Sequence, residues 1–503
     1  MISDLCFRMR FLLSSLSVLI TVALGAAESS APIPLRDLPL LFADDSGVAS
    51  SSGVKRTVHP ARTRPAAVLE GTLPQEGSRV YLTGSVYQDE ATGLLSMWYA
   101  GHPNLPDGKK PKVEGLRTGK GNFVLYATSK DGIAWDRPNL GQFEFQRSKD
   151  NNIIYDFHSP SVLFDPADPD TARRYKMLGS ITGAYYSATS PDGLHWTGPK
   201  QPIIKSSDNI TLTKDPLTGE YLAFVRMPAK LRGYPRRTVS LSRSRDFIAW
   251  SKPELVFAPD EQDDAWATAP GQRTEVNNMA VIPHAAGLLG FPTIFRVTVT
   301  DRNPAELGHG QSPTDGTLDV QLITSADGKK WQRTEKREPI IARGTEGSFD
   351  AGSIFGVSNT AVHVGDETWI YYTGMTTSHG APIPPKRIAI GRAEWRKHGF
   401  VSLDAGNEIA RIETKPLTLS KPNLIVNANA AAGEVRVALL EADGSPIAGH
   451  ALEDCTPLKA DSVRWSPQWK SNSPLPTDRP VRVLIELRQA SLYSLSCASA
   501  KHP

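Results

Sequence analysis

The sequence predicts an all-β chain, made of a five-bladed β-propeller followed by a C-terminal β-sandwich. Short β-branched and aromatic runs, separated by Gly, Pro, Asn and Asp, dominate its 503 residues, which include 40 Gly and 39 Pro. A phrase of the form Ser-x-Asp-(Gly)-x-x-Trp recurs after such runs, which indicates a repeated architecture. After about residue 408 the pattern changes to alternating strands of the kind that a sandwich contains.

The recurring phrase has four clear copies, each after a short β-like run. They occupy residues 129–135, 190–196, 244–250 and 325–331. We expect the Asp to accept hydrogen bonds from turn amides, the Gly to supply a positive φ, and the Trp to pack between repeats. The Asp residues of the phrase are therefore predicted to be structural. Phe247 replaces the Gly in the third copy, which predicts a different turn there.

Each repeat is predicted to start with two strands joined by a polar turn, followed by a third strand that leads into the phrase and a fourth around the Trp. The fifth copy keeps its strand and Trp395 but loses the turn, and its fourth strand is predicted at 400–403. Five such units fit a five-bladed propeller over residues 76–407. The first two strands of each unit are predicted at 84–87 and 95–99, 161–164 and 175–178, 210–213 and 221–225, 279–282 and 288–291, and 360–364 and 368–372.

The segments outside the propeller have their own signatures. Residues 1–27 resemble an export signal, because Arg8 and Arg10 precede an apolar run and a small-residue cleavage site. We therefore expect a secreted or periplasmic protein. Residues 28–75 are expected to be an N-terminal extension or linker, and residues 408–503 the β-sandwich, which braces the propeller or binds carbohydrate.

The cysteine content and the net charge narrow the function classes. Cys455 and Cys497 could form a disulfide or remain two buried thiols, and the residues leave both alternatives open. The net charge of +3 gives no reason to expect a nucleic-acid partner, and no later segment resembles a membrane span. We expect no required metal or organic cofactor, although a structural Ca²⁺ on the propeller axis is compatible with the sequence. The oligomeric state is left open.

Three carboxylates stand where inner strands of the predicted propeller begin: Asp208, Glu275 and Asp350. Facing carboxylates beside a cation can have their pKa values pushed apart, which gives one acid and one base. We therefore interpret Glu275 as a general acid and Asp208 or Asp350 as the base or nucleophile. Each Asp could instead simply cap a turn. The predicted substrate-binding residues are His158, Arg273, Asn277, Arg226 and His379.

The repeated phrase, Met97-Trp98-Tyr99, Arg174-Tyr175-Lys176-Met177 and the five inner strands resemble the five-bladed propeller glycoside hydrolases of families 32 and 43. The resemblance covers residues 76–405 and implies a secreted hydrolase that acts on a saccharide. Those families are expected to carry Asp, Asp and Glu on the first three blades, and the matching strands here do not. Sialidases use a related Asp-containing turn, but their spacing differs by one residue and they have six units.

Residues and resemblance together predict hydrolysis of a glycosidic bond in an oligo- or polysaccharide. The alternative is a propeller that binds carbohydrate without cleaving it, and a third hypothesis is a scaffold whose sandwich mediates assembly. Convergence of Asp208, Glu275 and Asp350 in one pocket would favour the enzyme. Separate turns with Arg or backbone partners would favour binding or scaffolding.

Overall fold

The computed structural model describes residues 31–498, except 37, 106–108, 118–120, 199–200, 207, 301 and 472. Strands account for 48% of the chain and helices for 3%, so the predicted all-β class is confirmed. The predicted signal peptide, residues 1–27, lies outside the described residues. The described helical elements are one short α-helix and three 3₁₀ turns: α1 (Glu261–Asp264), η2 (Thr171–Arg173), η3 (Pro304–Glu306) and η4 (Leu452–Asp454).

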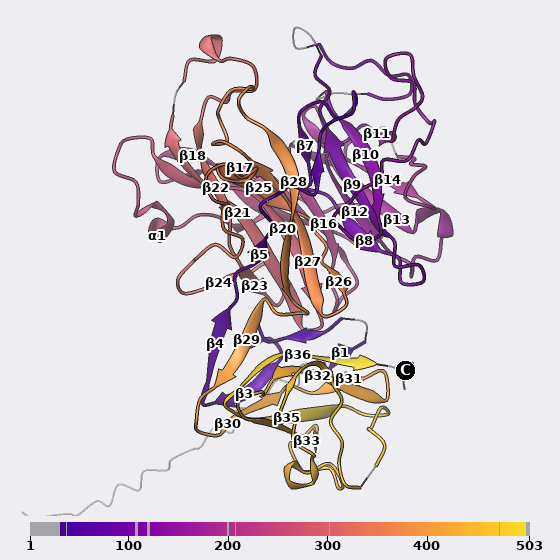
Figure 1. Cartoon of the computed structure of the whole chain (residues 1–503), viewed down its shortest axis with the longest axis vertical. Helices are drawn as coiled ribbons and strands as arrows, with labels where there is room; N and C mark the ends of the chain where they lie inside the picture. Colours follow the sequence, from indigo (N-terminus) through magenta and orange to yellow (C-terminus); the bar gives the residue numbers. More distant parts are fainter. Residues whose placement is uncertain are drawn as a thin grey trace, which may run out of the picture. The chain divides into compact units, whose positions relative to one another are not determined.

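Five antiparallel sheets contain the strands between residues 62 and 396, and we call this part the five-sheet region (Figure 1). In the second and third sheets, neighbours in the chain are neighbours in the sheet, whereas in the first sheet β7 and β8 both pair with β9. The first sheet contains β7 (Val80–Tyr81), β8 (Val86–Gln88), β9 (Leu95–Gly101), β10 (Phe123–Ser129) and β11 (Ile153–Tyr155). The second contains β12 (His158–Phe164), β13 (Tyr175–Ile181), β14 (Ala184–Ser190) and β15 (Ile204–Lys205). The third contains β16 (Ile210–Lys214), β17 (Tyr221–Leu231), β18 (Tyr234–Ser244) and β19 (Glu254–Phe257).

The fourth and fifth sheets repeat this order with split strands. The fourth contains β20 (Arg273–His284), β21 (Gly287–Val299), β22 (Asp315–Val320), β23 (Ile323–Ser325) and β24 (Gln332–Arg333). The fifth contains β25 (Ser353–Val357), β26 (Val362–Val364), β27 (Glu367–Met375), β28 (Ile388–Arg396), β5 (Arg62–Thr63) and β6 (Leu69–Glu70). The predicted strand pairs coincide with β8–β9, β12–β13, β16–β17, β20–β21 and β26–β27.

The turns of the recurring phrase are the predicted Asp-capped turns. Asp131 Oδ1 accepts hydrogen bonds from the amides of residues 133 and 134 at 2.8 and 2.9 Å, and these bonds lower the pKa of Asp131. The prediction of a different turn at Phe247 is wrong. Phe247 takes a φ of 64°, close to the 71° of Gly132, and its amide donates to Ser244 Oγ at 2.9 Å. The same turn forms because the Phe247 ring is buried against Tyr221, which offsets the cost of a left-handed backbone.

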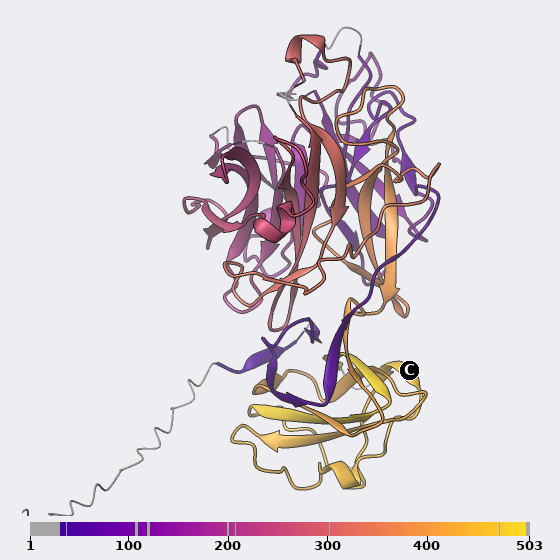
Figure 2. The same ribbon diagram turned by 90° about the vertical axis from the view of Figure 1, so that its left-hand side faces the viewer.

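The described part of residues 28–75 forms strands, where the sequence predicted an extension or linker. It supplies strands to three sheets, and Figure 2 shows this indigo segment passing among orange and yellow strands. β5 and β6 pair with β28 and so form the outer strand of the fifth sheet. The strand predicted there, 400–403, instead forms β29 and pairs with β4 and β36. Pairing with a distant segment removes an exposed edge, and local sequence patterns do not report such pairing.

Two six-stranded sheets make up the remainder, which we call the two-sheet region. One sheet contains β1 (Ile33–Leu35), β3 (Val48–Ser52), β30 (Ala410–Thr414), β31 (Leu417–Leu419), β33 (Glu434–Glu441) and β35 (Val481–Arg488). The other contains β2 (Leu40–Leu41), β4 (Val54–Val58), β29 (Val401–Ala405), β32 (Asn423–Asn429), β34 (Asp461–Trp465) and β36 (Ala490–Ala498). Buried residues of both sheets share one hydrophobic core.

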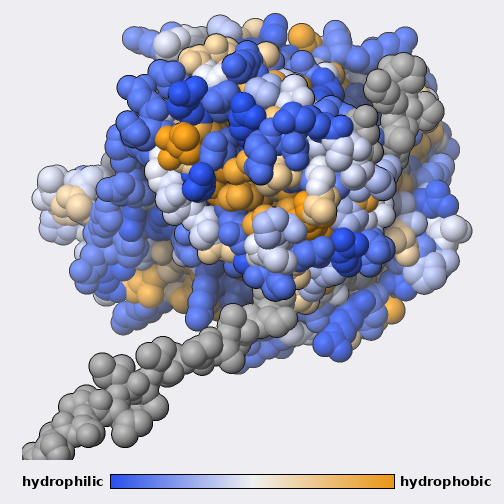
Figure 3. Space-filling model, turned by 90° about the horizontal axis from the view of Figure 1, so that it is seen from below, coloured by the Kyte–Doolittle hydropathy of each residue, from blue (hydrophilic) through white to orange (hydrophobic). Residues whose placement is uncertain are grey.

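The surface seen from below carries mainly hydrophilic residues, with a few hydrophobic residues gathered near its middle (Figure 3). Among the described residues, no helix has the length and apolar character needed to cross a membrane. In the part of the chain that the structure describes, Cys455 and Cys497 are both free and buried. They are therefore two separate thiols here and do not form a disulfide.

One buried asparagine connects the first strands of several sheets. Asn359 Nδ2 donates to Ser161 Oγ at 3.0 Å and to the Leu212 carbonyl at 2.7 Å, while its Oδ1 accepts from Ser85 Oγ at 2.6 Å. Ser161 lies on β12, Leu212 on β16 and Ser85 just before β8. The first strands of different sheets therefore converge, which brings the residues that precede them to one place.

Candidate functional site

Residues that precede or open first strands, such as Asp208 and His158, line part of a cavity of about 210 Å³, which we call the histidine pocket. Three imidazoles lie in its wall, those of His102, His158 and His379. The wall combines polar groups with apolar ones, as saccharide and other small-molecule sites do. Its other main lining residues are Tyr81, Thr83, Asp208, Phe355, Met375 and Lys386.

Asp208 is the one carboxylate among the described residues that lines the histidine pocket. Its Oδ1 lies 3.4 Å from His158 Nε2, and its Oδ2 accepts a short hydrogen bond from Arg226 Nη2. The side chain is 24% exposed, so a ligand could reach it. Asp208 also has a φ of 130°, a conformation that residues other than glycine rarely adopt and that is concentrated at functional sites.

Arg226 and Asn277 extend this cluster away from the pocket. Arg226 Nη1 donates to Asn277 Oδ1 at 3.4 Å, while its other terminal nitrogen holds Asp208. Arg226 comes from β17 and Asn277 from β20, so the third and fourth sheets position the group together. The structure thus brings four of the predicted residues into one network: His158, Asp208, Arg226 and Asn277.

Glu275 is engaged by two guanidinium groups. Its Oε1 accepts from Arg273 Nε at 2.8 Å, and its Oε2 accepts from Arg237 Nη1 at 3.1 Å. The Glu275 side chain is only 5% exposed. A general acid must present a proton to its substrate, and here both oxygens accept from cations instead. The arrangement is that of a carboxylate that positions arginines.

Asp350 lies outside the histidine pocket. It precedes β25, its side chain is buried, and its oxygens accept from the hydroxyls of Ser348 and Tyr372, both at 2.7 Å. Burial, together with the negative charge of Asp350, raises the pKa of Tyr372. Asp350 does not line the pocket with Asp208, so the predicted convergence of three carboxylates does not occur. These contacts match the turn-capping alternative.

His379 stands in the pocket wall between aromatic rings. Its ring stacks on Phe355 with centroids 5.9 Å apart and an interplanar angle of 10°, and its centroid lies 4.9 Å from that of Phe295. Burial lowers the pKa of His379 to about 3, with further lowering by the charges of Arg237 and Lys386. His379 is therefore a neutral ring at physiological pH.

Two cations at the site were missed by the sequence reasoning. Lys386 lines the pocket, and its Nζ donates to the carbonyls of Gly310 and His379 at 3.0 and 2.8 Å. Burial lowers the pKa of Lys386 to about 8. Arg237 lies on β18, whose hairpin with β17 continues for eleven residues on each strand. The two-residue turn of this hairpin is Arg232-Gly233, and both residues have positive φ. Gly233 is the feature of the sequence that could have indicated this turn.

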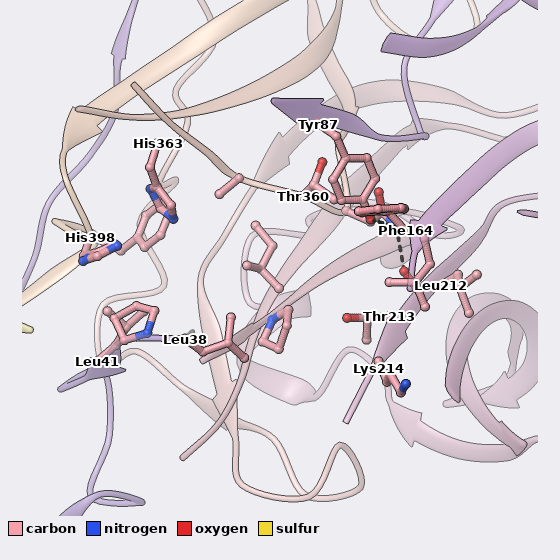
Figure 4. A pocket seen from close by; sticks show the side chains of 17 residues that line it. Leu38, Leu41, Tyr87, Phe164, Leu212, Thr213, Lys214, Thr360, His363 and His398 are labelled. Carbon is pink, nitrogen blue, oxygen red and sulfur yellow. Dashed lines mark hydrogen bonds between the residues drawn. The ribbon is translucent and has the colours of Figure 1, made fainter. Parts of the chain in front are cut away.

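A second, more apolar cavity of about 280 Å³ does not have the character of a catalytic site. Figure 4 shows His363 and His398 together on one side and Tyr87, Phe164 and Leu212 on the other. Burial lowers the pKa of His363 to about 4 and that of His398 to about 2, so both rings are neutral. No described Asp or Glu lines this cavity. Within the described residues, no group of three His, Cys, Asp or Glu side chains could hold a metal ion.

Comparisons with known proteins give weak likenesses. No protein-family model matches the chain, and no curated protein matches it. An N-acetylgalactosamine deacetylase from F. plautii is 16% identical, with a TM-score of 0.43 over 69% of this chain and 97% of its own. A glycoside hydrolase is 12% identical, with a TM-score of 0.43 over 66% and 92%. A GH62 hydrolase in complex with xylotriose is 12% identical, with a TM-score of 0.39 over 67% and 97%. At these scores no functional conclusion rests on them.

Proposed function

We propose that the five-sheet region is a five-bladed β-propeller and that the two-sheet region is a β-sandwich. The support comes from five consecutive antiparallel sheets, with β5 and β6 completing the last sheet. Asn359, which follows β25 of the fifth sheet, hydrogen-bonds Ser85, Ser161 and Leu212 from the first three sheets. The N-terminal strands β1–β4 would then belong to the sandwich and not to a linker. Export to the periplasm or the cell exterior, from the signal-like residues 1–27, is part of this proposal.

We propose further that the protein is a glycoside hydrolase whose saccharide enters the histidine pocket. The observation that carries the proposal is Asp208, a partly exposed carboxylate with a strained backbone that faces His158 in this pocket. Tyr81 and Phe355 supply aromatic surface on which a sugar ring can stack. A cavity that combines apolar surface with a few convergent polar groups is the usual form of such a site.

The roles of the residues follow from their contacts. Asp208 is held by Arg226 and so supplies a negative charge, as base or nucleophile, beside the anomeric carbon. His158 lies 3.4 Å from Asp208, closer than the about 5–9.5 Å that separates the two catalytic groups of a glycosidase, so His158 orients this carboxylate. Glu275 has no direct role in this scheme, because it positions Arg237 and Arg273. Asp350 holds the turn before β25.

A screen of the mature protein on aryl-glycosides and polysaccharides tests this proposal. We expect hydrolysis that Asp208→Asn reduces by about 10²–10⁴-fold, the usual contribution of a positioned acid or base. Asp350→Asn is the matched control, since it removes a carboxylate outside the pocket and is expected to retain activity. Hydrolysis by the Asp208→Asn variant at the wild-type rate would remove Asp208 from the reaction.

A second candidate function is carbohydrate binding without cleavage. It is favoured because Asp208, Glu275 and Asp350 do not converge in one pocket and the last two have partners elsewhere. Among the described residues only Asp208 supplies a carboxylate to the pocket, whereas glycosidic hydrolysis usually needs two. In that case the same screen would detect no product, while calorimetry would detect saccharide binding that Asp208→Asn weakens.

A further inference from the structure

The surroundings of the histidine pocket contain more cations than carboxylates. Among the described residues, Lys386 lines the pocket. Five arginines stand behind its lining residues without lining it themselves: Arg79, Arg226, Arg237, Arg273 and Arg302. The carboxylates that accompany them are three: Asp208, Glu275 and Asp315. The excess of three positive charges is unusual in a partly buried site, where charges are normally paired.

The pairing of individual groups shows where the excess lies. Glu275 is shared between Arg237 and Arg273, so one carboxylate serves two guanidinium groups. Lys386 forms no ion pair with a described carboxylate, and its ammonium donates to two backbone carbonyls. Burial lowers the pKa of Lys386; the charge of Asp315 opposes this lowering, and the charge of Arg79 adds to it.

Polar atoms without partners point to the same cavity. Thr83 lines the pocket and is 7% exposed, yet its hydroxyl has no hydrogen-bond partner among the described residues. The same holds for His379 Nδ1 and for Asn277 Nδ2, and Asn277 is fully buried. Buried polar groups are nearly always satisfied, so unsatisfied ones around a cavity indicate groups that a ligand completes.

We propose that the ligand of the histidine pocket is an acidic saccharide, a sugar carrying a carboxylate or sulfate group that Arg237, Arg79 and Lys386 recognise. The proposal rests on the proposed saccharide site and specifies its substrate class. An anionic group placed among these cations restores the charge balance, and guanidinium groups match planar or tetrahedral oxyanions in bidentate geometry. The sugar hydroxyls would meet Thr83 and His379.

The decisive experiment is calorimetric titration with matched ligands. One series uses uronic-acid trisaccharides (galacturonate, glucuronate and mannuronate) and their methyl esters, in which the carboxylate is replaced by an uncharged ester. Sulfated disaccharides and neutral oligosaccharides form the other arms. We expect at least one acidic ligand to bind about 10- to 100-fold more tightly than its uncharged counterpart, with an affinity that falls as salt increases.

Variants assign the effect to the residues. Lys386→Gln and Arg237→Gln keep a hydrogen-bond donor but remove the charge, and each should reduce the acid-over-ester ratio about 10-fold or more. Arg79→Gln serves as a further variant if either protein unfolds. Lys470→Gln is the matched control, because Lys470 is an exposed lysine paired with Asp454 in the two-sheet region. The control should bind like the wild type.

The possible outcomes distinguish an error in the proposed substrate class from an error in the proposed saccharide site. Tight binding of a sulfated sugar alone would support the inference and identify the anion as sulfate. Equal affinity for acidic and neutral saccharides would overturn the inference and leave the saccharide site standing. Absence of binding to every saccharide would overturn both.

Discussion

Replacing Glu275 by Gln distinguishes a carboxylate that positions arginines from a catalytic acid. The Glu275 side chain is 5% exposed, and its partners Arg273 and Arg237 are 10% and 23% exposed at 2.8 and 3.1 Å. The amide has one accepting oxygen and presents an NH₂ group to the second guanidinium. Two nearly buried cations then lose their counter-charge. Breaking a buried ion pair from one side costs about 3–5 kcal/mol of folding free energy.

The assay is urea unfolding of the wild type and Glu275→Gln, followed by fluorescence. Glu486→Gln is a matched control, because Glu486 also accepts from an arginine, at 2.9 and 3.1 Å, but Arg411 is 59% exposed. Exposed pairs contribute about 0–1 kcal/mol, so this control should unfold almost like the wild type. A Glu275→Gln protein of wild-type stability that has lost 10²-fold or more of its hydrolytic rate would refute our reasoning. That result would support the interpretation of Glu275 as the general acid.

Three further predictions concern pH and packing. Burial lowers the pKa of His363 to about 4 and of His379 to about 3, so the unfolded chain binds extra protons below pH 6.5. The free energy of unfolding should therefore fall as pH drops from 6.5 towards 4. His363→Asn should reduce the slope of this pH dependence by about 1.4 kcal/mol per pH unit. An unchanged slope would show that His363 does not contribute to the pH dependence. Because Lys386 has a pKa lowered to about 8, acidic saccharides should bind more weakly as the pH rises through 8, and titrations of Lys386→Gln should lack this step. Gly132→Ala should destabilise the fold by about 1–3 kcal/mol more than Gly141→Ala in thermal unfolding. Both glycines have positive φ, but a Cβ at Gly132 would lie 2.5 Å from the Tyr371 hydroxyl oxygen, whereas none lies within 4 Å at Gly141; equal losses would show that backbone strain alone decides.

The strand pattern of the five-sheet region could be predicted because its determinants are local. Asp131 and its counterparts accept hydrogen bonds from amides two and three residues further along the chain. The turn is therefore determined by the few residues of the phrase itself. The exception is Phe247, where the same turn forms without glycine because tertiary burial of the ring outweighs backbone preference. The part played by β5 and β6 was not predictable in this way, since their partner β28 lies more than 300 residues away.

The site was predicted in part for the same reason. His158, Asp208 and Arg226 were found because the residues that open or pair with first strands could be located from the repeats. The turn-capping alternative for Asp350 could be stated because its partner Ser348 is two residues away. The role of Glu275 could not be found, because it depends on Arg237 from another strand. Periodicity gives the side of a strand on which a side chain lies, but not the group that it meets there.

A crystal structure of the protein with a bound saccharide tests the central claim most directly. Our account predicts a sugar in the histidine pocket, with hydroxyl or ring oxygens within hydrogen-bond distance of Asp208 and His158 and its anionic group beside Lys386 or Arg237. A saccharide bound in the apolar cavity beside His363, or only on the two-sheet region, with the histidine pocket empty, would contradict it.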